Sequence, residues 1–195
     1  MLIGYADPPY IGCAHLYSNE PDYAGEVDHE FLMRRLNRDF DGWVLHAAAT
    51  PLSIATLAPL ALDLGARWCV WVKGFAAFKK NVSVAYAWEP VIIKSARKPV
   101  VSGRIVMRDW IQESITLKRG LTGAKPEKVC HWAFELLGSR PEDDLADLYP
   151  GTGAVSAAWQ TWRDSLTPES ILPSAAVVLS PIASALWARG TTRNP

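Results

Sequence analysis

Short apolar runs alternate along the chain with longer segments in which apolar positions recur at helical spacing. The runs predicted to be strands span residues 2–6, 42–47, 67–73, 90–93 and 145–148, with 175–179 as a candidate last strand. The segments predicted to be helices span residues 28–37, 51–64, 126–137 and 153–163. Strands that are apolar on both faces and alternate with helices are typical of an α/β layer fold built on a mostly parallel sheet.

Two of the predicted strands lead into unusual loops. The first strand is followed by DPPY (residues 7–10), and the fifth leads into DLYPGTG (residues 147–153). Ligands of parallel α/β sheets bind at the carboxyl ends of the strands. These two loops are therefore the first candidates for a functional site.

Length and composition fit a single domain spanning residues 1–195, with 49% apolar and 21% charged residues. We expect no signal peptide, because the N-terminus runs straight into a strand-like segment without a basic region and a long apolar region. We expect no membrane contact, because the most apolar late stretch, 174–188, is about 15 residues long and a bilayer span needs about 20. The three cysteines, Cys13, Cys69 and Cys130, share no metal-like spacing. A disulfide framework and a metal site are therefore not expected, and the cytoplasm is the expected location.

Charge is distributed unevenly, although the net charge is zero. Residues 94–128 hold nine Lys and Arg against three Asp and Glu, whereas the segments on either side are acidic. A basic segment between acidic flanks suits contact with phosphates, and a solvated loop is equally compatible with the count. The part without clear periodicity, 95–124, is expected to be an irregular excursion from the sheet.

The DPPY segment offers a way to activate an exocyclic amino group of a nucleic-acid base. Such a nitrogen is a poor nucleophile, because its lone pair is delocalised into the ring. Two acceptors aimed at its N–H bonds, the Asp7 carboxylate and the Pro8 carbonyl, favour the sp3 geometry needed for attack. Pro8 and Pro9 stiffen the loop, and Tyr10 offers a flat face to an extruded base. A proline-rich turn with Asp7 as a local cap is the competing interpretation.

The DLYPGTG segment is a glycine turn between a strand and a helix. Gly151 and Gly153 allow the backbone to approach a nucleotide-like ligand closely. Ser156 takes the third position of a G-x-G-x-x-G pattern and is small but not Gly. By itself, such a segment is more often an ordinary turn.

Together, the two segments resemble motifs of the S-adenosylmethionine-dependent DNA amino-methyltransferases. DPPY looks like the catalytic motif of that family, and DLYPGTG resembles its D-x-F-x-G-x-G cofactor motif. Lys125-Pro126, followed by a helix, resembles the K-P segment that precedes the cofactor motif. The order of the three is similar to that of the circularly permuted, beta-type members, and the resemblance covers about residues 1–165.

The resemblance implies a Rossmann-like, doubly wound sheet of the class I methyltransferase type with permuted motif order. It also implies S-adenosylmethionine as cofactor and transfer of its methyl group to DNA, with N6 of adenine favoured by the acidic first position of DPPY. Asp7 and the Pro8 carbonyl would hold the target amine, and Tyr10 would stack on the base. The residues that would shape the cofactor pocket are Asp147, Tyr149, Gly151 and Gly153, with Lys125 and Pro126 nearby as scaffold.

The basic segment 95–124 is a candidate minimal target-recognition segment. Members of the family usually carry a larger one, so its size implies weak sequence specificity, or a dimer or other partner that supplies the rest. The residues proposed to contact nucleic acid are Arg104, Arg108, Lys118 and Arg119.

Other functions stay open at this point. The fold normally supplies a strand that ends in an acid for the ribose hydroxyls; Asp164 and Glu169 lie near that spacing, but neither follows an apolar strand. The alternatives are cytosine N4, RNA or a protein amide as substrate, or a non-enzymatic nucleic-acid-binding protein on a methyltransferase scaffold. Cytosine-C5 chemistry is excluded, because it needs a nucleophilic cysteine, usually directly after Pro, and none of the three cysteines follows a Pro.

Polar and aromatic side chains also stand at the ends of the predicted strands. His46 is a candidate to face the pocket, and Trp88 or Glu89 to line the base site. Lys73 stands at a strand end as well. Core packing or a structural ion pair is the alternative to a place at the base site.

Overall fold

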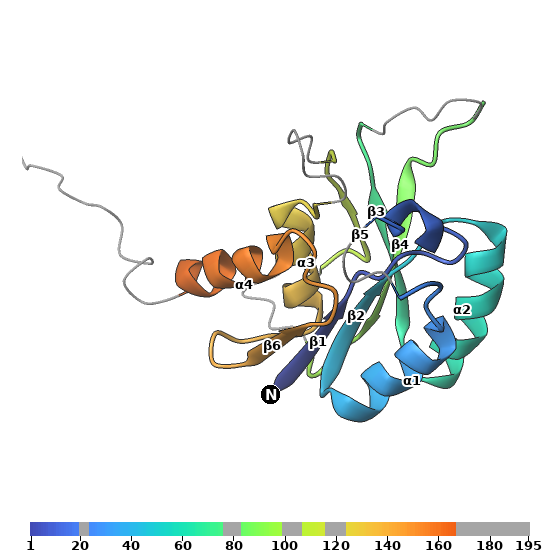
Figure 1. The fold of residues 1–195 in the computed structure, drawn as a ribbon. Coiled ribbons are helices and arrows are strands. Elements are labelled where there is room, and N and C mark those ends of the chain that lie inside the picture. Colours follow the sequence, from blue (N-terminus) through green and yellow to red (C-terminus); the bar gives the residue numbers. More distant parts are fainter. Residues whose placement is uncertain (20–23, 76–82, 99–106, 116–123, 167–195) are drawn as a thin grey trace, which may run out of the picture.

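The computed structural model describes residues 1–19, 24–75, 83–98, 107–115 and 124–166, which form a mixed α/β layer structure (Figure 1). Its six strands lie in the order β5-β3-β4-β2-β1-β6. They are β1 (Leu2–Ala6), β2 (Gly42–His46), β3 (Arg67–Val72), β4 (Trp88–Lys94), β5 (Trp110–Gln112) and β6 (Asp144–Asp147). The helices are α1 (His29–Asp39), α2 (Pro51–Asp63), α3 (Glu127–Leu136) and α4 (Ala154–Ser165), with a short 3-10 helix η1 (Ala14–Tyr17).

The sheet is mostly parallel, as predicted. β4 runs antiparallel to its neighbours β2 and β3, whereas every other pair of neighbours is parallel. Because β4 is reversed, it begins at the edge of the sheet where the other strands end. This reversal brings Glu89, near the start of β4, to the carboxyl ends of β1 and β2.

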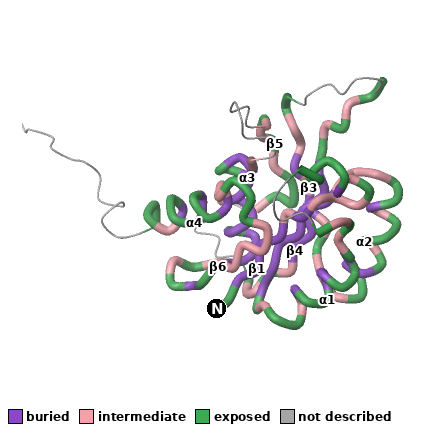
Figure 2. The backbone as a smooth tube through the Cα atoms, viewed as in Figure 1, coloured by how far each residue is buried: buried purple, intermediate pink, exposed green. Residues whose placement is uncertain are grey.

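Helices cover both faces of the sheet, α1 and α2 on one face and α3 and α4 on the other (Figure 1). Successive strand residues point to opposite faces. Trp43 and Leu45 of β2 therefore enter the core beside α1 and α2, and Val44 enters the core beside α3 and α4. Figure 2 shows the central strands as the buried part of the chain, which explains why they are apolar on both faces. No helix in the described ranges has the length and apolar character needed to cross a membrane.

Local signals in the sequence set the helix starts. The Asp28 carboxylate accepts a hydrogen bond from the Phe31 N–H at 2.9 Å and caps α1. Thr50 caps α2 in the same way, through Ser53 N–H at 3.2 Å, and Pro51 stands in the first turn. These starts were predicted; α1 continues to Asp39, beyond the predicted end.

The excursion 95–124 contains a strand that the sequence analysis did not predict. β5 pairs in parallel with the second half of β3, from Val70 to Val72. Three residues are too few to show alternation, so the strand is defined by its backbone pairing with β3 and not by its own pattern. The Trp71 indole N–H adds a hydrogen bond to the Glu113 carbonyl at 2.8 Å. The candidate last strand, 175–179, lies outside the described residues.

The two unusual loops leave neighbouring strands. β1 and β6 pair in parallel with Tyr5 opposite Asp147, and the Leu148 N–H donates to the Tyr5 carbonyl at 2.9 Å. The next long helix after β1 is α1, on one face, and β6 leads to α4 on the other (Figure 1). Adjacent strands whose connections go to opposite faces mark the point at which such sheets bind ligands.

We expect Asp143, at the opposite end of the sheet, to contribute stability that is lost in acid. Its side chain is 1% exposed and accepts hydrogen bonds from Arg97 Nη1 at 2.7 Å, from the Met1 amino group at 3.0 Å and from the Arg140 N–H at 2.8 Å. Burial raises the pKa of Asp143, but these hydrogen bonds outweigh it and lower the pKa from 3.8 to about 2. A lowered pKa means that the contribution, about 2 kcal/mol, is complete above about pH 4 and mostly lost by pH 2.

Urea unfolding tests this expectation. Asp143→Asn should reduce the free energy of unfolding by about 2 kcal/mol at pH 7 and by much less at pH 2. The matched control is Asp144→Asn, which neutralises the exposed neighbour and should leave stability within about 0.5 kcal/mol. An equal loss at both pH values for Asp143→Asn would contradict the assignment.

Candidate active site

DPPY follows directly on β1 and folds back on itself. The Tyr10 carbonyl accepts a hydrogen bond from the Cys13 N–H at 2.7 Å, which closes a turn. The Tyr10 hydroxyl donates to Asp7 Oδ1 at 3.3 Å. A half-buried carboxylate and a phenol are thus held together at the carboxyl end of β1.

The Lys125 ammonium lies against this turn. Its Nζ is 3.0 Å from Asp7 Oδ1, 2.9 Å from the Tyr10 hydroxyl oxygen and 2.9 Å from Glu89 Oε1. Burial lowers the pKa of Lys125, but the charges of Asp7 and Glu89 outweigh it and hold the pKa above its ordinary value. Lys125 therefore stays charged although its side chain is only 7% exposed.

Glu89 connects this lysine to the interior. Its carboxylate accepts a hydrogen bond from His46 Nδ1 at 2.9 Å, and its other oxygen is 2.9 Å from Lys73 Nζ. Burial raises the pKa of Glu89, but the positive charge of Lys125 and the contacts with His46 and Lys73 lower it well below its ordinary value. The five residues of this ionic cluster are Asp7, His46, Lys73, Glu89 and Lys125.

The cluster supplies its own cations. Ligand atoms of Asp7, His46 and Glu89 lie within 4.8 Å of one another, which is close enough for a shared cation. The Lys125 ammonium already contacts two of the three, and Lys73 contacts Glu89 from the other side. Two carboxylates thus face two ammonium groups, and the charges balance without a metal ion.

The DLYPGTG loop leaves β6 as a tight turn. Gly151 and Gly153 have φ of 43° and 73°, in the left-handed region that favours glycine. Gly153 precedes the first residue of α4, and a Cβ added there would meet no atom within 4 Å. The backbone of this turn is therefore open on the side where a side chain would stand.

Asp147 stands at the start of that turn. Its oxygens accept hydrogen bonds from the Tyr149 N–H and from the Ser156 hydroxyl, both at 3.3 Å. Burial raises the pKa of Asp147; the two hydrogen bonds oppose the rise, and the negative charge of Asp7 adds to it. The acids of the two loops therefore lie close enough to interact electrostatically.

The structure brings the predicted DPPY, Lys125 and DLYPGTG residues to one edge of the sheet, and Pro126 is buried at the start of α3. Glu89 forms an ion pair with Lys73 there, the alternative that was left open for it, and also accepts a hydrogen bond from His46. Trp88 is 37% exposed.

Two further members of the network were missed from the sequence. The Tyr5 hydroxyl lies 2.7 Å from His46 Nε2 and 3.8 Å from Cys130 Sγ. Burial raises the pKa of Cys130 to about 12, which makes it an unreactive thiol. In the sequence, Tyr5 is one aromatic residue in an apolar strand, and nothing in that pattern reveals a polar partner.

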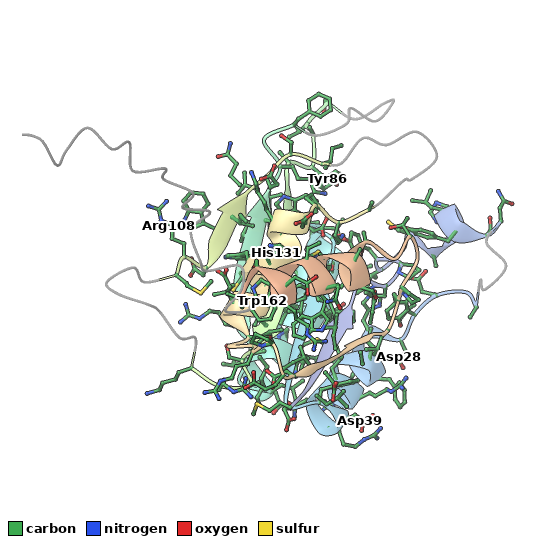
Figure 3. The ribbon with its side chains drawn as sticks, turned by 90° about the vertical axis from the view of Figure 1, so that its left-hand side faces the viewer. Asp28, Asp39, Tyr86, Arg108, His131 and Trp162 are labelled. Carbon is green, nitrogen blue, oxygen red and sulfur yellow. The ribbon has the colours of Figure 1, made fainter. Side chains whose placement is uncertain are left out.

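Of the four basic residues proposed to contact nucleic acid, Arg108 alone lies within the described residues. Arg108 stands before β5 with its guanidinium 5.2 Å from the centre of the Trp110 ring, at the side of the molecule and away from the end where Tyr86 lies (Figure 3). Arg104, Lys118 and Arg119 lie outside the described residues. Of the acids considered for ribose binding, Asp164 lies in α4 and accepts a hydrogen bond from Gln160 at 2.8 Å, and Glu169 is outside the described residues.

No family model matches the sequence, and neither does any curated protein. Among solved structures, the crystal structure of the M1.HpyAVI–SAM complex has a TM-score of 0.52 at 13% identity and covers 83% of this chain and 77% of that chain. The crystal structure of M1.HpyAVI gives 0.49 at 14% identity, over 83% and 76%. The first likeness is one of fold, and together with the sheet topology it confirms the predicted α/β class.

Proposed function

We propose that this protein transfers a methyl group from S-adenosylmethionine to an exocyclic amino group of a nucleic-acid base, with N6 of adenine in DNA as the first candidate. One observation carries the proposal: DPPY and DLYPGTG leave neighbouring parallel strands, with Asp7 and Asp147 close enough to interact. The fold shared with M1.HpyAVI, which was crystallised with SAM, supports the choice of cofactor.

The residues at the glycine turn suit that cofactor. The backbone at Gly153 is open, and the N-terminus of α4 begins there, which favours the carboxylate of an amino-acid group. The hydrogen bonds to Asp147 within the described residues come from uncharged donors, so its carboxylate can accept from the ammonium or hydroxyl groups of the cofactor. When bound, S-adenosylmethionine supplies a methyl group activated by its sulfonium.

The protein's own contribution centres on Asp7. Its carboxylate and the Pro8 carbonyl are proposed to accept hydrogen bonds from the two N–H groups of the target amine. These hydrogen bonds favour localisation of the nitrogen lone pair for attack. Tyr10 holds Asp7 through its hydroxyl, and its ring is proposed to stack on the extruded base. The proton that the amine loses on methylation would pass to Asp7 or to solvent.

The permuted motif order and the nucleic-acid contacts belong to the same proposal. The DPPY loop, proposed to be catalytic, follows β1, and the DLYPGTG loop, proposed to bind the cofactor, follows β6, which is next to β1 in the sheet. Arg104, Arg108, Lys118 and Arg119 are proposed to contact phosphates. The small size of this segment favours weak sequence specificity, or a second copy or partner that completes recognition.

The test is incubation of the purified protein with unmethylated DNA and S-adenosylmethionine, followed by mass spectrometry of the nucleosides. N6-methyladenine supports the proposal, and N4-methylcytosine in its place would move the target base while keeping the chemistry. Parallel reactions with RNA and with a glutamine-containing protein separate the other substrates. Absence of methyl transfer to all of them, with no binding of S-adenosylhomocysteine at millimolar concentration, would leave a non-enzymatic nucleic-acid-binding protein.

We expect Gly153→Ala to weaken the binding of S-adenosylhomocysteine about tenfold. A φ of 73° costs an L residue roughly 1–2 kcal/mol, and no steric clash contributes, because a Cβ meets no atom within 4 Å. If the turn relaxes in the free protein, the ligand must restore the strained conformation, and 1.4 kcal/mol corresponds to a factor of about ten in Kd. Calorimetric titration measures the change.

Gly65→Ala is the matched control for this variant. Gly65 has a φ of 65° and open space around it, but it follows α2 at the opposite end of the sheet. The control should lose similar stability and keep the wild-type Kd. An equal loss of affinity in both variants would show that the DLYPGTG turn has no special relation to the cofactor.

A further inference from the structure

We propose that Glu89, acting through Lys125, is a positioning residue for Asp7: the lysine ammonium occupies one carboxylate oxygen of Asp7 and leaves the other, Oδ2, for the target amine. The inference rests on the proposed function and deepens it. It assigns roles to two buried charges that the methyl-transfer chemistry itself does not require.

The two oxygens of Asp7 are not equivalent. Oδ1 is 3.0 Å from Lys125 Nζ and accepts the Tyr10 hydroxyl at 3.3 Å. Within the described residues, Oδ2 accepts no hydrogen bond. A carboxylate held by one oxygen has a fixed orientation, and its second oxygen is free to accept from a ligand.

Lys125 is itself held in place. An ammonium group has three N–H donors, and Lys125 Nζ has three acceptors at 2.9–3.0 Å, on Asp7, Tyr10 and Glu89. The contacts with Tyr10 and Glu89 are hydrogen bonds, the contact with Asp7 is an ion pair, and the side chain is buried, so the ammonium has little freedom to move. Its position is therefore determined by where Glu89 stands.

The Glu89 carboxylate is also held by side chains other than Lys125. His46 donates to Oε1 and Lys73 contacts Oε2, both at 2.9 Å, and Tyr5 holds the far side of the His46 ring at 2.7 Å. Glu89 also carries the charge that balances half of the positive charge in the cluster. If that charge is removed, Asp7 is the one carboxylate of the cluster left to neutralise Lys125, and we expect the ammonium to approach both of its oxygens.

Capture of Oδ2 by Lys125 would remove the acceptor that the amine needs. Small displacements of catalytic groups cost up to roughly a hundredfold in rate. We therefore expect Glu89→Gln, which preserves shape and removes charge, to lower kcat roughly tenfold to a hundredfold. The KM for S-adenosylmethionine and the affinity for S-adenosylhomocysteine should stay at the wild-type values, because the cofactor is proposed to contact the other loop.

A double-variant cycle separates positioning from general support of the fold. In a Lys125→Met background, Glu89→Gln should cause no further loss of kcat, because Glu89 acts through the missing ammonium. The same fold-loss in both backgrounds would overturn the proposal. The matched control is Asp143→Asn, which neutralises a carboxylate that is equally buried and ion-paired at the opposite end of the sheet. It should lower stability and keep kcat.

A crystal structure of Glu89→Gln gives a readout that does not depend on activity. We expect both Asp7 oxygens within about 3.5 Å of Lys125 Nζ in the variant. An unchanged Asp7 with Oδ2 still free would reject the inference, whatever the substrate proves to be. Failure of the wild-type protein to methylate any acceptor would instead reject the proposed function, so the two failures are distinguishable.

Discussion

Asp7→Asn should lower kcat for methyl transfer roughly 100- to 1000-fold and leave the binding of S-adenosylhomocysteine close to that of the wild type. Asp7 is proposed to accept a hydrogen bond from an N–H group of the amine while positive charge develops on the amine nitrogen. An asparagine has one oxygen, and the Lys125 ammonium, 3.0 Å from the present Oδ1, will draw that oxygen to itself. The amide nitrogen, which is a donor, then takes the place of the acceptor that the amine requires.

Single-turnover rates at saturating cofactor are the measurement for this variant, because they isolate the chemical step from product release. Asp63→Asn serves as the control: it neutralises an exposed acid of α2 that contacts Arg34 at 3.5 Å, and its rate should match the wild type. A rate for Asp7→Asn within threefold of the wild type would exclude Asp7 as the acceptor. A normal rate combined with lost affinity for S-adenosylhomocysteine would place Asp7 in the cofactor site instead.

Those parts of the fold that depend on local signals were predicted from the sequence. The apolar runs form strands, and both faces of the sheet pack against helices. The helices capped by Asp28 and Thr50 begin where the sequence predicted. β5 could not be predicted, because its three residues form a strand only in the presence of the β3 backbone beside them. Strand order and direction are likewise tertiary properties that a single strand's pattern does not contain.

The same limit explains what was missing from the candidate site. DPPY, Lys125 and DLYPGTG were found because their residue types are unusual, and the rule that ligands bind at carboxyl strand ends made the two loops the first candidates for a functional site. Glu89 was named as a side chain at a strand end, but its contact with Lys125 was not predicted, because it stands at the beginning of its strand and the rule applies to carboxyl ends. It reaches the site because β4 is antiparallel, and that direction follows from the packing of the whole sheet.

The largest change in stability is expected from Lys125→Met. Removing one member of a buried ion pair leaves uncompensated charge and costs roughly 3–5 kcal/mol, whereas an exposed pair contributes about 1 kcal/mol or less. Here, two carboxylates within 3.0 Å of the ammonium would lose it at once. Lys128→Met makes the same substitution on a lysine that is 78% exposed and 3.4 Å from Glu113, and it should lower the free energy of unfolding by less than about 1 kcal/mol.

The pH dependence of this loss identifies its cause. Burial raises the pKa of Glu89, and Lys125, His46 and Lys73 lower it well below the ordinary value, so the carboxylate contributes stability that is present at neutral pH and lost as the pH falls. Without Lys125, the pKa of Glu89 rises, and a proton can replace part of the missing charge in acid. The difference in unfolding free energy between the wild type and Lys125→Met, from urea titrations, should therefore be larger at pH 7 than at pH 4. A difference that does not change with pH would mean that Lys125 stabilises the fold by packing of its methylene chain and not by its charge.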